Sequence, residues 1–166
     1  MNDAEICLRW VSDPDVIRFL GLLQPARTLD QERSWIASIL TDKQHQRAFI
    51  IQDEHGRPIG TCGLRGIDRE ARTAFLGIMI GEKSLWDRGY GAAATEALLA
   101  LAFTDLGLEE VRLSCHAENR RAVRCYRKVG FRPSSHAPDR ARFGRQEVRM
   151  AIDRQRWETG QAADSG

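Results

Sequence analysis

The sequence predicts a single mixed α+β domain, and three observations carry that prediction. The first is a run of three strand-like segments joined by short loops, at 47–53, 59–66 and 73–80. The second is the change after residue 80 to helical connections between strands. The third is the length, because 166 residues suffice for one domain with a sizeable core. Since short loops join antiparallel neighbours, we expect a mixed, mostly antiparallel sheet flanked by helices. The change to helical connections further predicts that this sheet splays open next to Ile80.

Three helices are predicted before the first strand. Asp3 is placed to cap a helix over 3–10, and Pro14 opens a short helix over 14–20, because proline is tolerated in the first helical turn. Thr28, with Gln three residues later, forms a capping box that opens a helix to about residue 40. The apolar residues of that helix are expected to be buried: Trp35, Ile36, Ile39 and Leu40.

The second half of the chain alternates between helix and strand. Gly130 stands where a left-handed residue commonly ends a helix. From residue 158 there is no apolar pattern, so we take 1–157 as the domain and expect 158–166 to be a disordered tail. The predicted elements are a helix at 92–106, a strand at 111–117, a helix at 120–129 and a strand at 148–152.

Composition excludes several classes of protein. No apolar run reaches the roughly 18 residues that a membrane span requires, and the N-terminus lacks the pattern of a signal peptide, so no membrane partner is expected. The four cysteines form no Cys-X-X-Cys pair, which favours free thiols in a reducing compartment and therefore a cytoplasmic protein. The four histidines show no metal-ligand spacing, and no metal is expected.

The net charge of +2 hides an asymmetry along the chain. Residues 112–149 contain eleven Arg or Lys but three acidic residues. Such a basic half predicts an anionic ligand or partner, and the alternative is a solvated face balanced by acids elsewhere in the fold. No nucleic-acid-binding motif accompanies it, so nucleic acid is not an expected partner.

The segment 86–97 says most about function. It links a predicted strand to a predicted helix, and Gly89 and Gly91 allow positive φ and close approach of a ligand to the backbone. The first N–H groups of a helix bind phosphate readily, although a plain turn explains the glycines equally well. Neither a Walker loop nor the dinucleotide fingerprint is present. The expected phosphate-binding residues are Arg88, Gly89, Tyr90, Gly91 and Ala92.

A second segment, Asn119 to Phe131, reads Asn-Arg-Arg-Ala-Val-Arg-Cys-Tyr-Arg-Lys-Val-Gly-Phe. Together with Trp86–Gly91 it resembles the GNAT acetyltransferase superfamily, and within it the branch of the ribosomal-protein N-terminal acetyltransferases. Asp13–Val16, Asp-Pro-Asp-Val, matches a further pattern of that branch. The resemblance covers roughly residues 3–153 and departs from the family in having no strand before the first helix. That strand is either missing or lies upstream of this sequence.

The resemblance implies acetyl-CoA as co-substrate, with no metal, and an amine acceptor that is either a small molecule or a protein N-terminus. It places the pyrophosphate at 88–92 and the amide arm along the edge of 73–80, where a main-chain N–H would stabilise the oxyanion. Asn119 would contact the arm, although asparagine is also a preferred helix N-cap. A homodimer is an open alternative to a monomer. The residues expected at the edge are Ile78, Met79 and Ile80.

The general acid and the general base of the implied reaction are assigned to different residues. Tyr126 lies two helical turns after Asn119 on the same face, and the resemblance makes it the acid that protonates the leaving thiolate; its apolar neighbours make a core role the alternative. The resemblance expects a glutamate where Phe75 stands, which leaves Glu82, His116 and Glu118 as candidate bases, or a water chain. We select His116, because imidazole titrates in the useful range.

Three functions from different classes stay open. The leading one is an acetyl-CoA-dependent N-acetyltransferase. The others are a coenzyme-binding regulator without turnover and a binder of the ribosome or nucleic-acid surface. The loop 21–27 and the helix opening at Thr28 are expected to line the acceptor side.

Overall fold

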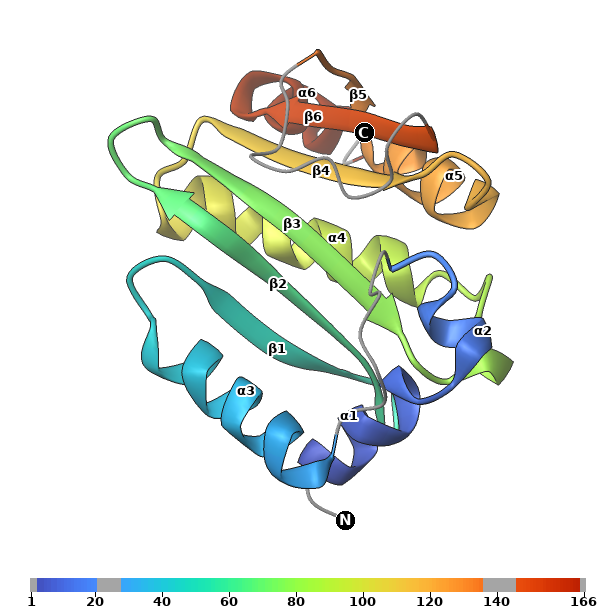
Figure 1. The fold of residues 1–166 in the computed structure, drawn as a ribbon. Helices are drawn as coiled ribbons and strands as arrows, with labels where there is room; N and C mark the ends of the chain where they lie inside the picture. Colours follow the sequence, from blue (N-terminus) through green and yellow to red (C-terminus); the bar gives the residue numbers. More distant parts are fainter. Residues whose placement is uncertain (1–2, 21–27, 136–145, 165–166) are drawn as a thin grey trace.

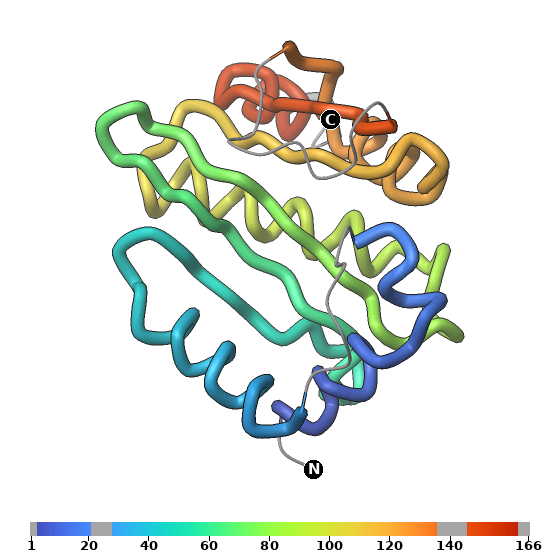
Figure 2. The backbone as a smooth tube through the Cα atoms, viewed as in Figure 1, coloured from blue at the N-terminus to red at the C-terminus, as the bar shows by residue number. Residues whose placement is uncertain are grey.

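The computed structural model describes residues 3–20, 28–135 and 146–164. In these ranges six strands form one mixed sheet in the order β1-β2-β3-β4-β6-β5 (Figures 1 and 2). The predicted single mixed sheet is therefore confirmed. The strands are β1 (Arg47–Gln52), β2 (Pro58–Asp68), β3 (Thr73–Ile80), β4 (Glu110–His116), β5 (Arg132–Pro133) and β6 (Glu147–Asp153).

The helices bury side chains on both faces of the sheet. One core joins Leu98 and Phe103 to Leu76, and the other joins Trp10 to Met79. The helices are α1 (Asp3–Val11), α2 (Pro14–Ile17), α3 (Leu29–Thr41), α4 (Tyr90–Ala100), α5 (Arg120–Val129) and α6 (Arg154–Asp164), with a 3-10 turn at Lys83–Leu85 and a π-helical turn at Leu101–Asp105 that extends α4.

The sheet opens between β3 and β4. These two strands are parallel, and their registered pairs run only from Thr73 opposite Glu110 to Phe75 opposite Arg112. From there β3 continues along β2 as far as Ile80, and β4 continues along β6 as far as His116. Figures 1 and 2 show the two strands diverging toward their C-terminal ends. The splayed sheet that the sequence predicts next to Ile80 is thus present.

The expected burial of α3 is partly wrong. Trp35 and Leu40 are 46% and 54% exposed, whereas Glu32 is fully buried. The helix lies beside the edge strand β1 (Figure 1). Only a narrow face of it is buried or partly buried. Glu32, Ile36 and Ile39 lie within one such face at helical spacing, and Trp35 and Leu40 flank it on either side. The four apolar residues that the sequence pattern places together thus span a wider stripe of the helix than the face that is buried against the domain.

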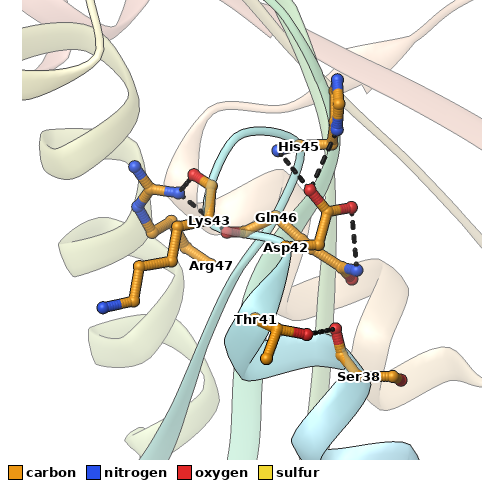
Figure 3. A network of polar contacts seen from close by, with 7 residues as sticks. All are labelled: Ser38, Thr41, Asp42, Lys43, His45, Gln46 and Arg47. Atoms are coloured by element: carbon orange, nitrogen blue, oxygen red, sulfur yellow. Dashed lines mark hydrogen bonds and ion pairs between the residues drawn. The ribbon is translucent and has the colours of Figure 1, made fainter.

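The connection from α3 to β1 is held by the carboxylate of Asp42 (Figure 3). Its Oδ1 accepts hydrogen bonds from the backbone N–H of His45 at 3.2 Å and from the ring Nδ1 of the same residue at 2.9 Å. The bond to the imidazole is the main reason why the pKa of Asp42 lies below its usual range. The carbonyl of His45 in turn accepts from the N–H of Ile67 at 2.9 Å, which joins the turn to β2.

The C-terminus differs from the expected disordered tail, because α6 continues to Asp164. Its first turn fixes it to the domain. The backbone N–H of Arg156 donates to the Asp153 carboxylate at 2.8 Å, and the Trp157 ring packs 5.4 Å from that of Phe103. A single aromatic residue at the start of a polar segment gives no periodic apolar pattern, so the sequence does not predict this helix. Within the described ranges, no helix is long and apolar enough to cross a bilayer.

Candidate active site

The glycine turn between β3 and α4 leaves the N-terminus of α4 without a side-chain cap. Gly89 is the N-cap of α4 with φ +90°, and no side chain caps the first N–H groups of the helix. A Cβ on Gly89 would meet nothing within 4 Å, so glycine is required there for its dihedral angle and not for space. These N–H groups therefore stay available to a ligand, at the positive end of the helix dipole.

A cavity of about 660 Å³ lies at the opening of the sheet. It extends from the glycine turn, past the exposed edge of β3, to the first turns of α5 and to α2. The structure thus brings together residues that are more than forty positions apart in the sequence. Of the predicted site residues, the cavity is lined by Ile78, Met79, Ile80, Arg88, Gly89, Tyr90, Gly91, Ala92, Asn119 and Tyr126.

Along the edge of β3 that faces the cavity, only every second residue directs its main-chain N–H and C=O groups toward the cavity. The N–H of Gly81 donates to the carbonyl of Ile59 at 2.8 Å, so the main-chain groups of Gly81 point toward β2. Because these groups alternate in direction along a strand, those of Met79 also point toward β2, and those of Ile78 and Ile80 point toward the opening. Of the three residues predicted for the edge, Ile78 and Ile80 offer their backbone there.

The carbonyl of Ile80 is already engaged. It accepts a hydrogen bond of 2.8 Å from the indole N–H of Trp86. The face of the same indole carries the guanidinium of Arg121, with Cζ 3.6 Å from the ring centroid. Trp86 therefore joins the end of β3 to the start of α5 across the cavity. The main-chain groups left for a ligand are the N–H and C=O of Ile78 and the N–H of Ile80.

Asn119 and Tyr126 occupy the same face of α5. The Oδ1 of Asn119 accepts from the N–H of Ala122 at 3.2 Å, so this side chain is the N-cap of α5 and also lines the cavity. Tyr126 is 8% exposed, and its ring meets Phe131 edge-on at 5.8 Å. Burial raises the pKa of the Tyr126 phenol well above its usual range, so the phenol keeps its proton. Both residues combine a structural contact with a position in the cavity.

None of the three candidate bases lines the large cavity. The Nδ1 of His116 accepts a hydrogen bond from the N–H of Glu118 at 3.2 Å, and its ring lies 5.4 Å from that of Phe19. Glu82 pairs with Arg9 and accepts from the indole N–H of Trp10 at 2.8 Å. The carboxylate of Glu82 thus fastens α1 to the end of β3.

Several cavity residues were not predicted. Phe19 and Leu20 follow the end of α2, and Arg124 and Cys125 come from α5. The second pair follows from the helical spacing of the Asn119 segment, whereas nothing in the sequence links residues 15–20 to that segment. The loop 21–27, expected on the acceptor side, lies outside the described residues. The start of α3 does not line the cavity.

Comparison with known proteins agrees with this geometry. The model of the acetyltransferase (GNAT) domain family matches residues 1–132. The uncharacterized N-acetyltransferase p20 of Bacillus licheniformis is 28% identical over 134 residues, which are 79% of this chain and 74% of that protein. The aminoglycoside N(6')-acetyltransferase type 1 of Klebsiella pneumoniae is 24% identical over an alignment of 177 positions that covers 93% of this chain and 83% of that protein.

Among solved structures, the spermidine N-acetyltransferase of Vibrio cholerae in complex with CoA and spermine superposes with a TM-score of 0.81. The two chains are 21% identical, with 94% of this chain and 92% of the other covered. These relatives do not single out the ribosomal-protein branch that the sequence resembles. They support the superfamily and leave the narrower resemblance without support. The chain belongs to the GNAT family and is an acetyl-CoA-dependent N-acetyltransferase.

Proposed function

We propose that this enzyme acetylates a primary amine of a small molecule, by direct attack of the amine on the thioester of acetyl-CoA. The observation that carries the proposal is a single cavity of about 660 Å³ that joins an uncapped helix N-terminus, an open strand edge and a buried tyrosine. The relatives support a small-molecule acceptor, because those of known activity are named for spermidine and aminoglycosides.

The coenzyme binds by its phosphates and its arm. The pyrophosphate accepts from the N–H groups at the start of α4, and the exposed Arg88 adds a charge-assisted bond. The amide arm pairs with the backbone of Ile78, as an added strand would. The N–H of Ile78 or Ile80 then donates to the acyl carbonyl oxygen, where negative charge develops in the tetrahedral intermediate.

The amine nitrogen forms its bond to the acyl carbon, and the C–S bond breaks with its electron pair going to sulfur. We assign Tyr126 as the donor to that thiolate. A raised pKa makes full proton transfer from the phenol harder, but burial of the thiolate in the same cavity raises the pKa of the thiol as well. The attacking amine loses its proton to water, because Nδ1 of His116 already accepts a hydrogen bond.

Release of free thiol from acetyl-CoA tests the proposal against a panel of small amines and peptides. We expect turnover with at least one small primary amine. Coenzyme binding without thiol release from any amine would favour the regulator. Binding to ribosomes or RNA that weakens steeply with salt, again without turnover, would favour the surface binder.

A further inference from the structure

A second hollow of about 300 Å³ opens beside the cavity of about 660 Å³, between α2 and the start of α5. The two share Asp15, Phe19, Trp86, Asn119 and Arg121, so they are continuous. The hollow contains none of the glycine-turn residues 88–92. It is therefore separate from the turn to which the proposed function assigns the phosphates of the coenzyme.

Three arginines line this hollow, which we call the arginine vestibule: Arg18, Arg120 and Arg121. Among the described residues, none of the three has a carboxylate within 4.0 Å, in contrast to Arg124, which lies 3.6 Å from Asp87. Of the two carboxylates that line the vestibule, Asp15 is held by Lys83 at 2.9 Å. The vestibule thus presents three guanidinium groups against the one remaining carboxylate of Glu118.

Two of these guanidinium groups lie on aromatic rings. The Cζ of Arg18 is 5.1 Å from the ring centroid of Phe19, and that of Arg121 is 3.6 Å from Trp86. A stacked guanidinium keeps the N–H groups in its plane free, and these match the two oxygens of a carboxylate. Stacking also restrains the side chains, so less conformational freedom is lost when an anion binds.

We propose that the acceptor carries a carboxylate near its reactive amine, as an α-amino acid does, and that the arginine vestibule binds this carboxylate. The inference rests on the proposed function and adds the chemical class of the acceptor. A polycation such as spermidine gains nothing from these arginines and is repelled by them. The 3′-phosphate of the coenzyme is the other anion that could reach them, and the experiment separates the two.

The test compares matched acceptors. Each of several α-amino acids is assayed beside its carboxamide, which keeps the amine and removes the negative charge, with spermidine and kanamycin as polycations. We expect kcat/KM for the acids to exceed that for the amides by about ten-fold or more, as a charge-assisted hydrogen bond implies. Equal rates for acid and amide, or a preference for a polycation, would overturn the inference and leave the acetyltransferase proposal standing.

Variants of the arginines show whether these side chains cause the preference for acids over amides. Arg18→Gln and Arg120→Gln should each lower the acid-to-amide ratio of kcat/KM by about ten-fold, through KM for the acceptor. Arg156→Gln is the matched control, because Arg156 is exposed on α6 and lines neither hollow. A rise in KM for acetyl-CoA instead would assign the arginines to the coenzyme and refute the inference. Absence of thiol release with every amine would count against the proposed function itself.

Discussion

The indole N–H of Trp86 donates a hydrogen bond of 2.8 Å to the carbonyl oxygen of Ile80, the last main-chain acceptor on the open edge of β3. This bond fixes the turn that leads into the glycine N-cap of α4. It also engages the Ile80 carbonyl, so this group is not open to the coenzyme arm. In the function that we propose, the arm therefore pairs with the main chain of Ile78 and the N–H of Ile80.

Replacing Trp86 by Phe should weaken coenzyme binding while the fold survives. Phe keeps a ring under Arg121 but removes the donor to the Ile80 carbonyl, which is partly exposed at the cavity, so the loss is that of an ordinary hydrogen bond, about 0.5–1.5 kcal/mol. We expect the free energy of unfolding to fall by no more than that, and KM for acetyl-CoA to rise several-fold. Chemical denaturation and steady-state kinetics measure the two quantities. A variant with native KM for acetyl-CoA would show that the bond does not position the arm.

Gly91→Glu should abolish coenzyme binding without unfolding the protein. A Cβ at Gly91 would lie 3.6 Å from Sγ of Cys125, an ordinary contact, so the helix accepts a side chain there. The added carboxylate would face the pyrophosphate and repel it. Calorimetry should detect no CoA binding, whereas Gly91→Ala should bind within a few-fold of the wild type. Unchanged affinity of a folded Gly91→Glu protein would refute the site.

The substitution Tyr126→Phe distinguishes a role of Tyr126 as the general acid from a purely structural role in the core. The substitution removes only the hydroxyl, so the edge-on contact with Phe131 should persist and the melting temperature should barely change. If the phenol donates to the leaving thiolate, kcat should fall about 10²–10⁴-fold. Tyr126→Ala should in addition lose about 3–5 kcal/mol of stability through the cavity it leaves. A Phe variant within two-fold of native kcat, with chemistry rate-limiting, would end the assignment.

Cys125 should react slowly with iodoacetamide and be protected by acetyl-CoA, which has no free thiol to consume the reagent. Burial raises the pKa of its thiol, and the reactive thiolate forms only as the pH rises toward that raised pKa, so alkylation should increase with pH. Peptide mapping by mass spectrometry follows each cysteine. Saturating acetyl-CoA should slow alkylation of Cys125, which lines the cavity, and not that of Cys62, whose pKa burial raises to about 11. Equal alkylation of Cys125 with and without acetyl-CoA would contradict the cavity assignment.

Gly81→Ala should destabilise the protein through a steric clash. A Cβ at Gly81 would stand 2.1 Å from the ring of Trp10, which packs α1 against the end of β3. Overpacking of this kind costs about 1–3 kcal/mol. Gly77→Ala on the same strand is the control, because a Cβ there meets nothing within 4 Å. The two urea midpoints should differ clearly, and coincident curves would mean that Trp10 moves aside freely.

The sequence by itself determined the features that depend on residues a few positions apart, such as the ends of helices. The capping box of α3 forms as predicted, since the Thr28 N–H and the Gln31 side chain meet at 2.8 Å, and Gly130 ends α5 with φ +109°. These contacts join residues a few positions apart, so the pattern of residue types is enough to specify them. The two acetyltransferase motifs are local in the same way, one on each side of β4.

Only the tertiary structure decided which distant residues meet. The parting of β3 from β4 leaves Ile78 facing a cavity. The chain after α2 brings Phe19 to that cavity, whereas His116, whose ring lies beside that of Phe19, does not line it. Likewise, the narrow contact of α3 leaves Trp35 exposed, although the sequence pattern groups it with the apolar residues Ile36 and Ile39. Strand pairing and helix docking depend on contacts across the whole chain, and the free energy of those contacts appears in no local window of the sequence.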